Sequence, residues 1–233
     1  MTLEEKNQND ILNEFNDPND IEFIFSDKPI NRFKTKPEVE DKVYLLTKLK
    51  NDLQNIKNCE LKESAKKLVF SDGNSNSKIM IVGEGPGQKE DEVGKPFVGD
   101  AGLLLNKMLK AININRQDIY ITNVVNYRPP SNRKPETKEI RRYSEYLYEH
   151  VEIINPKLII LLGSTAMEAF FGSNLKISKE RGIWKEILIK NKTFLTMITF
   201  HPAYLLRQAD QKKYSWADLK LIRKKIDELK ISV

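Results

Sequence analysis

Four short apolar stretches, each ending at glycine or at polar residues, constrain the fold of this chain most strongly. They span residues 78–82, 119–125, 157–162 and 194–199. Apolar residues at helical spacing lie around them, at 39–57, 101–111, 136–154, 164–171 and 214–229. Alternating strands and helices with short connections are typical of a parallel sheet that helices cover on both faces. We therefore predict a single α/β domain with three layers (α/β/α) and a central, mainly parallel four-stranded sheet.

Residues 1–40 differ from the rest of the chain in composition. They hold ten acidic residues against five basic ones, and they contain the breakers D-P-N-D and K-P. Sustained periodicity is absent, apart from a short helical pattern around Ile11–Phe15. Segments of this kind rarely bury enough apolar surface to fold alone. We expect residues 1–40 to form a mobile acidic extension and residues 41–233 to form the folded domain.

The charge balance favours a polyanionic partner. The chain of 233 residues carries a formal net charge of +6 and residues 1–40 contribute −5, so the remainder carries about +11. A basic body is typical of proteins that bind nucleic acid, although many basic proteins do not. No apolar run reaches the roughly 18 residues that span a bilayer, and the first residues are polar. Together with a single cysteine, which fits a reducing compartment, these features predict a cytoplasmic protein without a membrane segment.

Three loops that follow predicted strands carry the candidate functional residues. They read G-E-G-P-G-Q-K-E-D-E-V-G-K-P-F-V-G-D-A-G (83–102), T-N-V-V-N-Y-R-P-P-S-N-R (122–133) and F-H-P-A-Y-L-L-R (200–207). Ligands bind at the carboxyl ends of parallel strands, so we expect these loops to meet in one site, with Asn123 and His201 at strand ends. The glycine-rich loop alone would also suit a nucleotide-phosphate-binding protein, which is an alternative function.

Taken together, these blocks and E-R-G-I-W at 180–184 resemble family 4 of the uracil-DNA glycosylase superfamily. The blocks occur in the family's order, and the resemblance covers about residues 56–228. It implies an enzyme of base excision repair that acts on uracil-containing DNA, single- or double-stranded. Such an enzyme flips uracil into a pocket and hydrolyses its N-glycosidic bond, leaving an abasic site. We expect the enzyme to be a monomer. The alternative function is that of a catalytically weak or inactive relative that only binds DNA or damaged bases.

The resemblance also assigns roles to individual residues. Glu84, Asn123 and His201 would be catalytic, and Gly85, Phe97, Asn123 and His201 would bind the uracil. Phe97 would stack on the base, Asn123 would read its O4 and N3–H edge, and His201 would donate a hydrogen bond to O2. Glu84 could orient water, stabilise the cationic sugar or exclude the methyl group of thymine. The candidate contacts to the DNA backbone are Arg128, Asn132, Arg133 and Arg207.

The sequence departs from the family pattern at the cofactor. Most family 4 enzymes hold a [4Fe–4S] cluster through four cysteines, whereas this chain has one cysteine in total. Cys59, in I-K-N-C-E-L, stands at one ligand position, and Ile56, Tyr127 and Tyr143 stand at the other three. One thiolate cannot hold such a cluster, so we predict that the cluster is absent and that no metal is bound. We expect the three replacements to fill the cluster's volume and to hold the same segments by packing.

Overall fold

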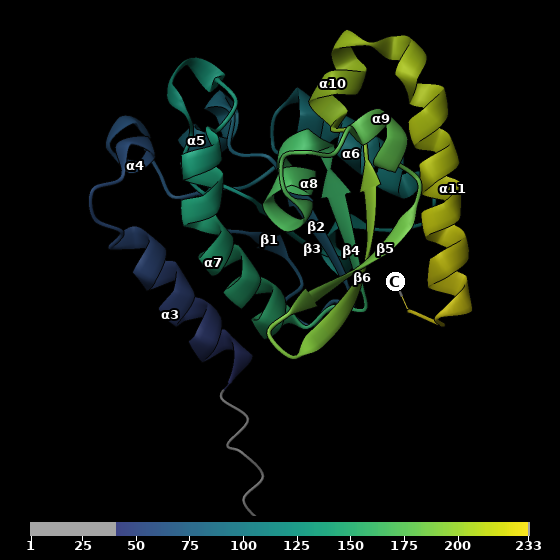
Figure 1. The fold of residues 1–233 in the computed structure, drawn as a ribbon, viewed down its shortest axis with the longest axis horizontal. Coiled ribbons are helices and arrows are strands. Elements are labelled where there is room, and N and C mark those ends of the chain that lie inside the picture. The colour runs from purple at the N-terminus through teal and green to yellow at the C-terminus, as the bar shows by residue number, and fades with distance from the viewer. Residues whose placement is uncertain (1–40, 233) are drawn as a thin grey trace, which may run out of the picture. The chain divides into compact units, whose positions relative to one another are not determined.

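The computed structural model of the chain describes residues 41–232 (Figure 1). Its helices are α3 (Lys42–Gln54), α4 (Glu60–Ser64), α5 (Gln88–Val93), α6 (Asp100–Lys110), α7 (Thr137–Ile154), α8 (Gly163–Phe171), α9 (Ile177–Glu180), α10 (Pro202–Arg207) and α11 (Lys212–Glu228). Its strands are β1 (Asp72–Gly73), β2 (Ile79–Gly83), β3 (Tyr120–Asn123), β4 (Leu158–Leu162), β5 (Trp184–Ile189) and β6 (Lys192–Thr199). Short 3-10 turns are η1 (Arg116–Asp118), η2 (Pro130–Asn132) and η3 (Ala209–Gln211). The expected acidic extension, with its helical pattern around Ile11–Phe15, lies outside the described residues.

The strands form one sheet in the order β1-β3-β2-β4-β6-β5. The inner strands β3, β2, β4 and β6 run parallel, and in their registers Gly83 lies beside Asn123. These inner strands are the four that the apolar stretches predict, so the mainly parallel core is confirmed. β1 and β5 add antiparallel edges that we did not predict, which makes the sheet six-stranded.

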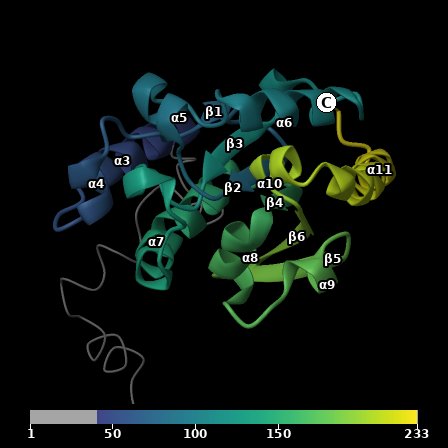
Figure 2. The same ribbon diagram turned by 90° about the horizontal axis from the view of Figure 1, so that it is seen from above.

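The period of two along each strand sends apolar side chains to both faces of the sheet. On β2, Met80 and Val82 belong to a core shared with α3, α7 and α8, whereas Ile79 and Ile81 belong to a core shared with α6 and α11. Figures 1 and 2 show these two groups of helices on opposite sides of the strands. The predicted three-layer arrangement is therefore confirmed.

The carboxyl ends of the parallel strands open on one edge of the sheet, at the top of Figure 1. The loops after β2, β3 and β6 start there and lead to α5, α7 and α10, whereas α8 begins directly after β4, at Gly163. These three loops are the blocks singled out in the sequence. Within residues 41–232, no helix has the length and apolar character needed to cross a membrane.

Candidate active site

A cavity of about 740 Å³ lies at this edge of the sheet, and the three loops and the start of α8 contribute to its walls. Its volume is in the range typical of small-ligand sites. Eight of the residues expected at the site line it, namely Glu84, Gly85, Phe97, Asn123, Asn132, Arg133, His201 and Arg207. The structure thus brings together all of the expected catalytic and uracil-binding residues. Arg128 is not among the lining residues, and neither are Ile56, Cys59, Tyr127 and Tyr143.

Asn123 ends β3 and lines the cavity. The side chain is 3% exposed, and its Oδ1 atom has no hydrogen-bond partner among the described residues. A buried acceptor left unpaired costs about 1–3 kcal/mol, so such an atom in a cavity wall points to a donor on a ligand. Gly83 allows this arrangement, because a Cβ there would lie 2.4 Å from Asn123 Oδ1 and 2.5 Å from Phe97 Cζ.

Phe97 lies in the loop between α5 and α6, with its ring in the cavity wall. Its ring centroid lies 5.5 Å from that of His201, with 28° between the two planes. The backbone of Phe97 has φ +52°, in the left-handed region that bulky residues rarely adopt. Such a conformation costs of order 1–3 kcal/mol and persists only where neighbouring contacts hold it.

His201 joins β6 to α10 and caps that helix. Its Nδ1 accepts a hydrogen bond of 3.1 Å from the Ala203 amide, which assigns the proton of the neutral ring to Nε2. Loss of hydration and, to a smaller extent, the charge of Arg207 together lower the pKa of His201 to about 4. At neutral pH His201 is therefore an uncharged donor whose free N–H belongs to Nε2.

Glu84 lies after β2, where the Val125 amide donates to its carbonyl oxygen over 3.2 Å. Its carboxylate accepts a hydrogen bond at Oε2 from the hydroxyl of Thr165, a fully buried residue of α8. Sequence reasoning missed Thr165, because only the loops after three strands were considered. The signal available was the fourth strand end, at Gly163, whose helix carries Thr165 into contact with the site.

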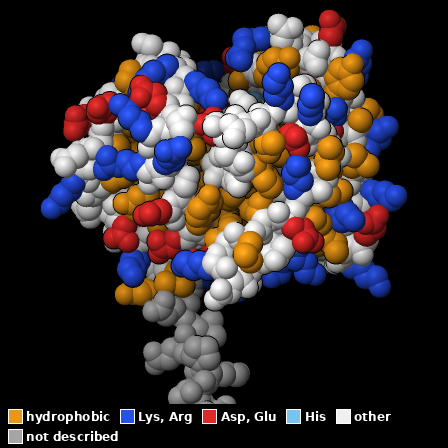
Figure 3. Space-filling model, viewed as in Figure 1, with side chains coloured by type: hydrophobic (Ala, Val, Ile, Leu, Met, Phe, Trp, Pro, Cys, Tyr) orange, Lys and Arg blue, Asp and Glu red, His pale blue; other side chains and the backbone are white. Residues whose placement is uncertain are grey.

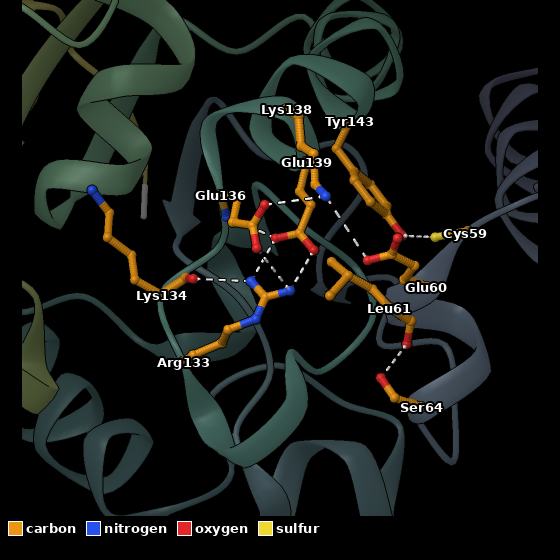
Figure 4. A network of polar contacts seen from close by, with 10 residues as sticks. All are labelled: Cys59, Glu60, Leu61, Ser64, Arg133, Lys134, Glu136, Lys138, Glu139 and Tyr143. Atoms are coloured by element: carbon orange, nitrogen blue, oxygen red, sulfur yellow. Dashed lines mark hydrogen bonds and ion pairs between the residues drawn. The ribbon is translucent and has the colours of Figure 1, made fainter.

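The basic residues around the cavity differ in how they are engaged. Arg207 is exposed at the end of α10, and Arg128 donates to Asn132 Oδ1 over 2.7 Å. Arg133 makes a bidentate pair with Glu139 at 2.8 and 2.6 Å, which holds the pKa of Glu139 below its usual range (Figure 4). Lys and Arg side chains are spread over the face drawn in Figure 3, with acidic side chains among them.

Comparison with known proteins identifies the family. The sequence model of the Uracil DNA glycosylase superfamily matches residues 70–221. A Type-4 uracil-DNA glycosylase of Thermotoga maritima is 44% identical over 150 residues, which are 64% of this chain and 77% of that protein. A Type-4 uracil-DNA glycosylase of Sulfurisphaera tokodaii is 40% identical over 186 residues, covering 76% and 83% of the two chains. The chain belongs to the uracil-DNA glycosylase superfamily.

The iron–sulfur cluster of the family 4 pattern does not fit the residues of this superfamily member. A [4Fe–4S] cluster takes four thiolate ligands, and Cys59 is the one cysteine of the chain. Its neighbours at the other expected ligand positions are the buried side chains Ile56, Tyr127 and Tyr143, which belong to the same apolar core. Among residues 41–232, no three His, Cys, Asp or Glu side chains come together in a way that could hold a metal ion.

Hydrogen bonds and packing join these positions. Cys59 Sγ and Tyr143 Oη lie 3.2 Å apart (Figure 4), and the Tyr127 hydroxyl donates to the Leu53 carbonyl over 3.3 Å. Burial raises the pKa of the Tyr143 hydroxyl, and the contact with Cys59 raises it further, so the group stays protonated. Next to Tyr143 on α7, Arg142 donates to the carbonyls of Lys57 and Asn58. The segment before α4 is thus fastened to α7 by side chains.

Proposed function

We propose that this protein is a uracil-DNA glycosylase, a hydrolase of DNA repair that removes uracil from DNA and leaves an abasic site. The observation that carries the proposal is the buried, unpaired Oδ1 of Asn123, in a cavity that Phe97 and His201 also line. Relatives named Type-4 uracil-DNA glycosylase support the same reaction. A phosphate-binding site would explain the glycine loop but neither the Asn123 acceptor nor the His201 donor.

Recognition would rest on the edge and the face of a flipped uracil. Asn123 Oδ1 would accept from N3–H of the base, and the amide nitrogen of Asn123 would donate to O4. Cytosine presents an amino group and an unprotonated N3 at these positions, so it would leave buried polar groups unpaired. Sites of this kind discriminate strongly. The Phe97 ring would stack on the flat face of the base.

Cleavage would break the bond between N1 of uracil and C1′ of the sugar, with the electron pair passing into the base. The Nε2–H of neutral His201 would donate to O2, where negative charge collects. A preorganised donor of this type is worth roughly 3–4 kcal/mol of barrier. Glu84, held by Thr165, would stabilise the cationic sugar and accept a hydrogen bond from the attacking water. The water oxygen bonds C1′, and its proton neutralises the uracil anion, directly or through solvent.

The DNA backbone would lie over the rim of the cavity. Arg207, Asn132 and Arg128 are the proposed phosphate contacts, and Arg133 would add charge while its donors remain on Glu139. We propose that the protein acts as a monomer. We also propose that it acts in the cytoplasm, because its single cysteine suits a reducing compartment.

The test is excision from a uracil-containing oligonucleotide, read as alkali cleavage on a gel, with cytosine and thymine oligonucleotides as controls. We expect cleavage by the wild-type protein at uracil only. Asn123→Ala and His201→Ala should each lower the single-turnover rate about 100-fold or more, whereas the exposed control Asn51→Ala on α3 should not change it. DNA binding without cleavage would identify a binding module, and cleavage by the double variant Asn123→Ala/His201→Ala would overturn the site assignment.

We further propose that the enzyme works without an iron–sulfur cluster, because the donor set around Cys59 does not fit one. The test is iron analysis of protein purified without oxygen, together with its absorption near 400 nm. We expect active protein with no stoichiometric iron. Iron in stoichiometric amount together with that absorption would overturn the proposal.

A further inference from the structure

The loop that carries Phe97 is held by hydrogen bonds with two charged side chains, Arg116 and Glu90. The backbone carbonyls at and just before Phe97 accept hydrogen bonds from Arg116, at the start of η1. Arg116 Nη2 donates to the Pro96 carbonyl over 2.6 Å, and Nη1 donates to the Phe97 carbonyl over 2.9 Å. The guanidinium is itself fixed by Asp72, which accepts from Nε over 2.9 Å, and by Asn106.

The backbone amides just after Phe97 are bound by Glu90, a buried residue of α5. Its Oε1 accepts hydrogen bonds from the amides of Val98 and Gly99, at 2.9 and 2.7 Å. The backbone partners of both side chains lie in the loop around Phe97 and at Gly99, the N-cap of α6.

The backbone of Phe97 explains why two such groups converge on it. With φ +52°, the residue would relax to an extended or right-handed conformation if its flanking peptides were free, and its ring would then leave the cavity wall. Gly102 permits this placement of Phe97, because a Cβ there would lie 1.9 Å from the Phe97 carbonyl oxygen.

We infer that Arg116 and Glu90 are positioning residues that hold Phe97 in its strained conformation, so that the ring is ready to stack on a flipped pyrimidine. The inference deepens the proposed function and rests on it for the identity of the stacked base. Arg116 acts on the carbonyls before and at Phe97, and Glu90 acts on the amides after it.

A double-variant cycle separates positioning from mere stabilisation. Arg116→Met removes every donor but keeps the length of the side chain, and it should lower kcat/KM on uracil DNA about 10- to 100-fold, as small misplacements do. In a Phe97→Ala background the same change should cost less than about twofold, because no ring remains to be positioned. Arg116→Lys should restore part of the loss. The inference would be overturned if Arg116→Met lowered kcat/KM equally in both backgrounds. It would also be overturned if Arg116→Met lowered kcat/KM less than about twofold in the wild-type background.

Hydrogen exchange tests the same restraint without using activity. We expect amides in the peptide spanning 94–103 to exchange about tenfold faster in Arg116→Met, with the peptide spanning β4 unchanged. The matched control is Arg142→Met, which also removes an arginine from two backbone carbonyls but at Lys57 and Asn58. It should leave 94–103 unchanged.

Unchanged exchange at 94–103 in Arg116→Met would overturn the inference. Faster exchange there would support it even if wild-type protein excised no uracil, in which case the proposed function alone would fail.

Discussion

Tyr143 is the residue through which the side-chain packing around Cys59 can be measured. Its side chain is 1% exposed and is among the largest fully buried side chains of the described residues. Removing a buried aromatic ring typically costs about 3–5 kcal/mol, so Tyr143→Ala should lower the free energy of unfolding by that amount. Tyr143→Phe removes only the hydroxyl that contacts Cys59 Sγ, and a sulfur partner is weak, so we expect about 0.5–1 kcal/mol.

Urea unfolding followed by circular dichroism measures both changes. The free energy of unfolding of a single domain is about 5–15 kcal/mol in total. Tyr143→Ala should therefore strongly lower the urea concentration at the unfolding midpoint, while the protein remains folded without urea. The matched control is Tyr146→Ala, one turn along α7, where the ring is only half-buried and lies 6.4 Å from that of Tyr143. It should cost clearly less than Tyr143→Ala.

An iron chelator gives the result that would refute this reasoning. If packing alone holds the segment, adding EDTA to wild-type protein should leave the urea midpoint unchanged. If EDTA lowered the free energy of unfolding by about 1 kcal/mol or more, a metal would hold the segment after all. If Tyr143→Ala lowered the free energy of unfolding by less than about 1 kcal/mol, the Tyr143 ring would not be a structural replacement for the cluster.

Three further predictions concern the site and the two histidines. Thr165→Val should lower kcat about tenfold with little change in KM, because Glu84 loses its donor, and Thr165→Ser should retain most activity; single-turnover kinetics decide this. With the pKa of His201 lowered to about 4, kcat/KM should stay level as pH falls to about 5 and decline only near 4, whereas a decline near pH 6.5 would contradict an uncharged donor. Burial lowers the pKa of His150 to about 3, so the unfolded chain binds more protons below pH 6.5 and stability should fall by about 1.4 kcal/mol per pH unit for each histidine. Urea unfolding between pH 6 and pH 5 should show this slope, and His201→Ala should reduce it by about half.

The inner sheet could be predicted because buried parallel strands are apolar along their whole length. Every residue of β2 and β4 is buried, and both strands stand out as uninterrupted runs. The edge strands carry no such signal. β1 comprises only Asp72–Gly73, and β5 alternates exposed and buried residues beside charged ones, so each is recognisable only through its antiparallel partner.

The site could be predicted only as far as side chains stand at strand ends. Asn123, His201 and Glu84 stand at or just after the carboxyl ends of strands, so topology alone brings them to one edge. Arg116 and Thr165 act through contacts that no spacing encodes. Thr165 lies 81 positions from Glu84, and Arg116 lies 44 positions from Asp72 and 19 from Phe97. Such partners appear only when the sheet order is known.

The residues that hold the active-site side chains are different from the residues that pack around Cys59. The residues around Cys59 can therefore be replaced while the contacts of the active site are kept. Ile56, Cys59, Tyr127 and Tyr143 belong to the core on the α3 and α7 side of the sheet and do not line the cavity. Glu84, His201 and the loop of Phe97 instead each have a nearby restraint of their own. The Thr165 hydroxyl holds Glu84, the Ala203 amide holds His201, and the Arg116 and Glu90 side chains hold the loop of Phe97.

One route does connect the two regions. Tyr127 precedes the proline loop, whose Arg133 pairs with Glu139 one turn before Tyr143 on α7 (Figure 4). Loosening the core at Tyr143 should therefore weaken the hold on Asn132 and Arg133 at the cavity rim before it disturbs Asn123 or His201. In kinetic terms, Tyr143→Phe should raise KM for DNA more than it lowers the single-turnover rate. The reverse pattern would mean that the packing around Cys59 supports the chemistry directly.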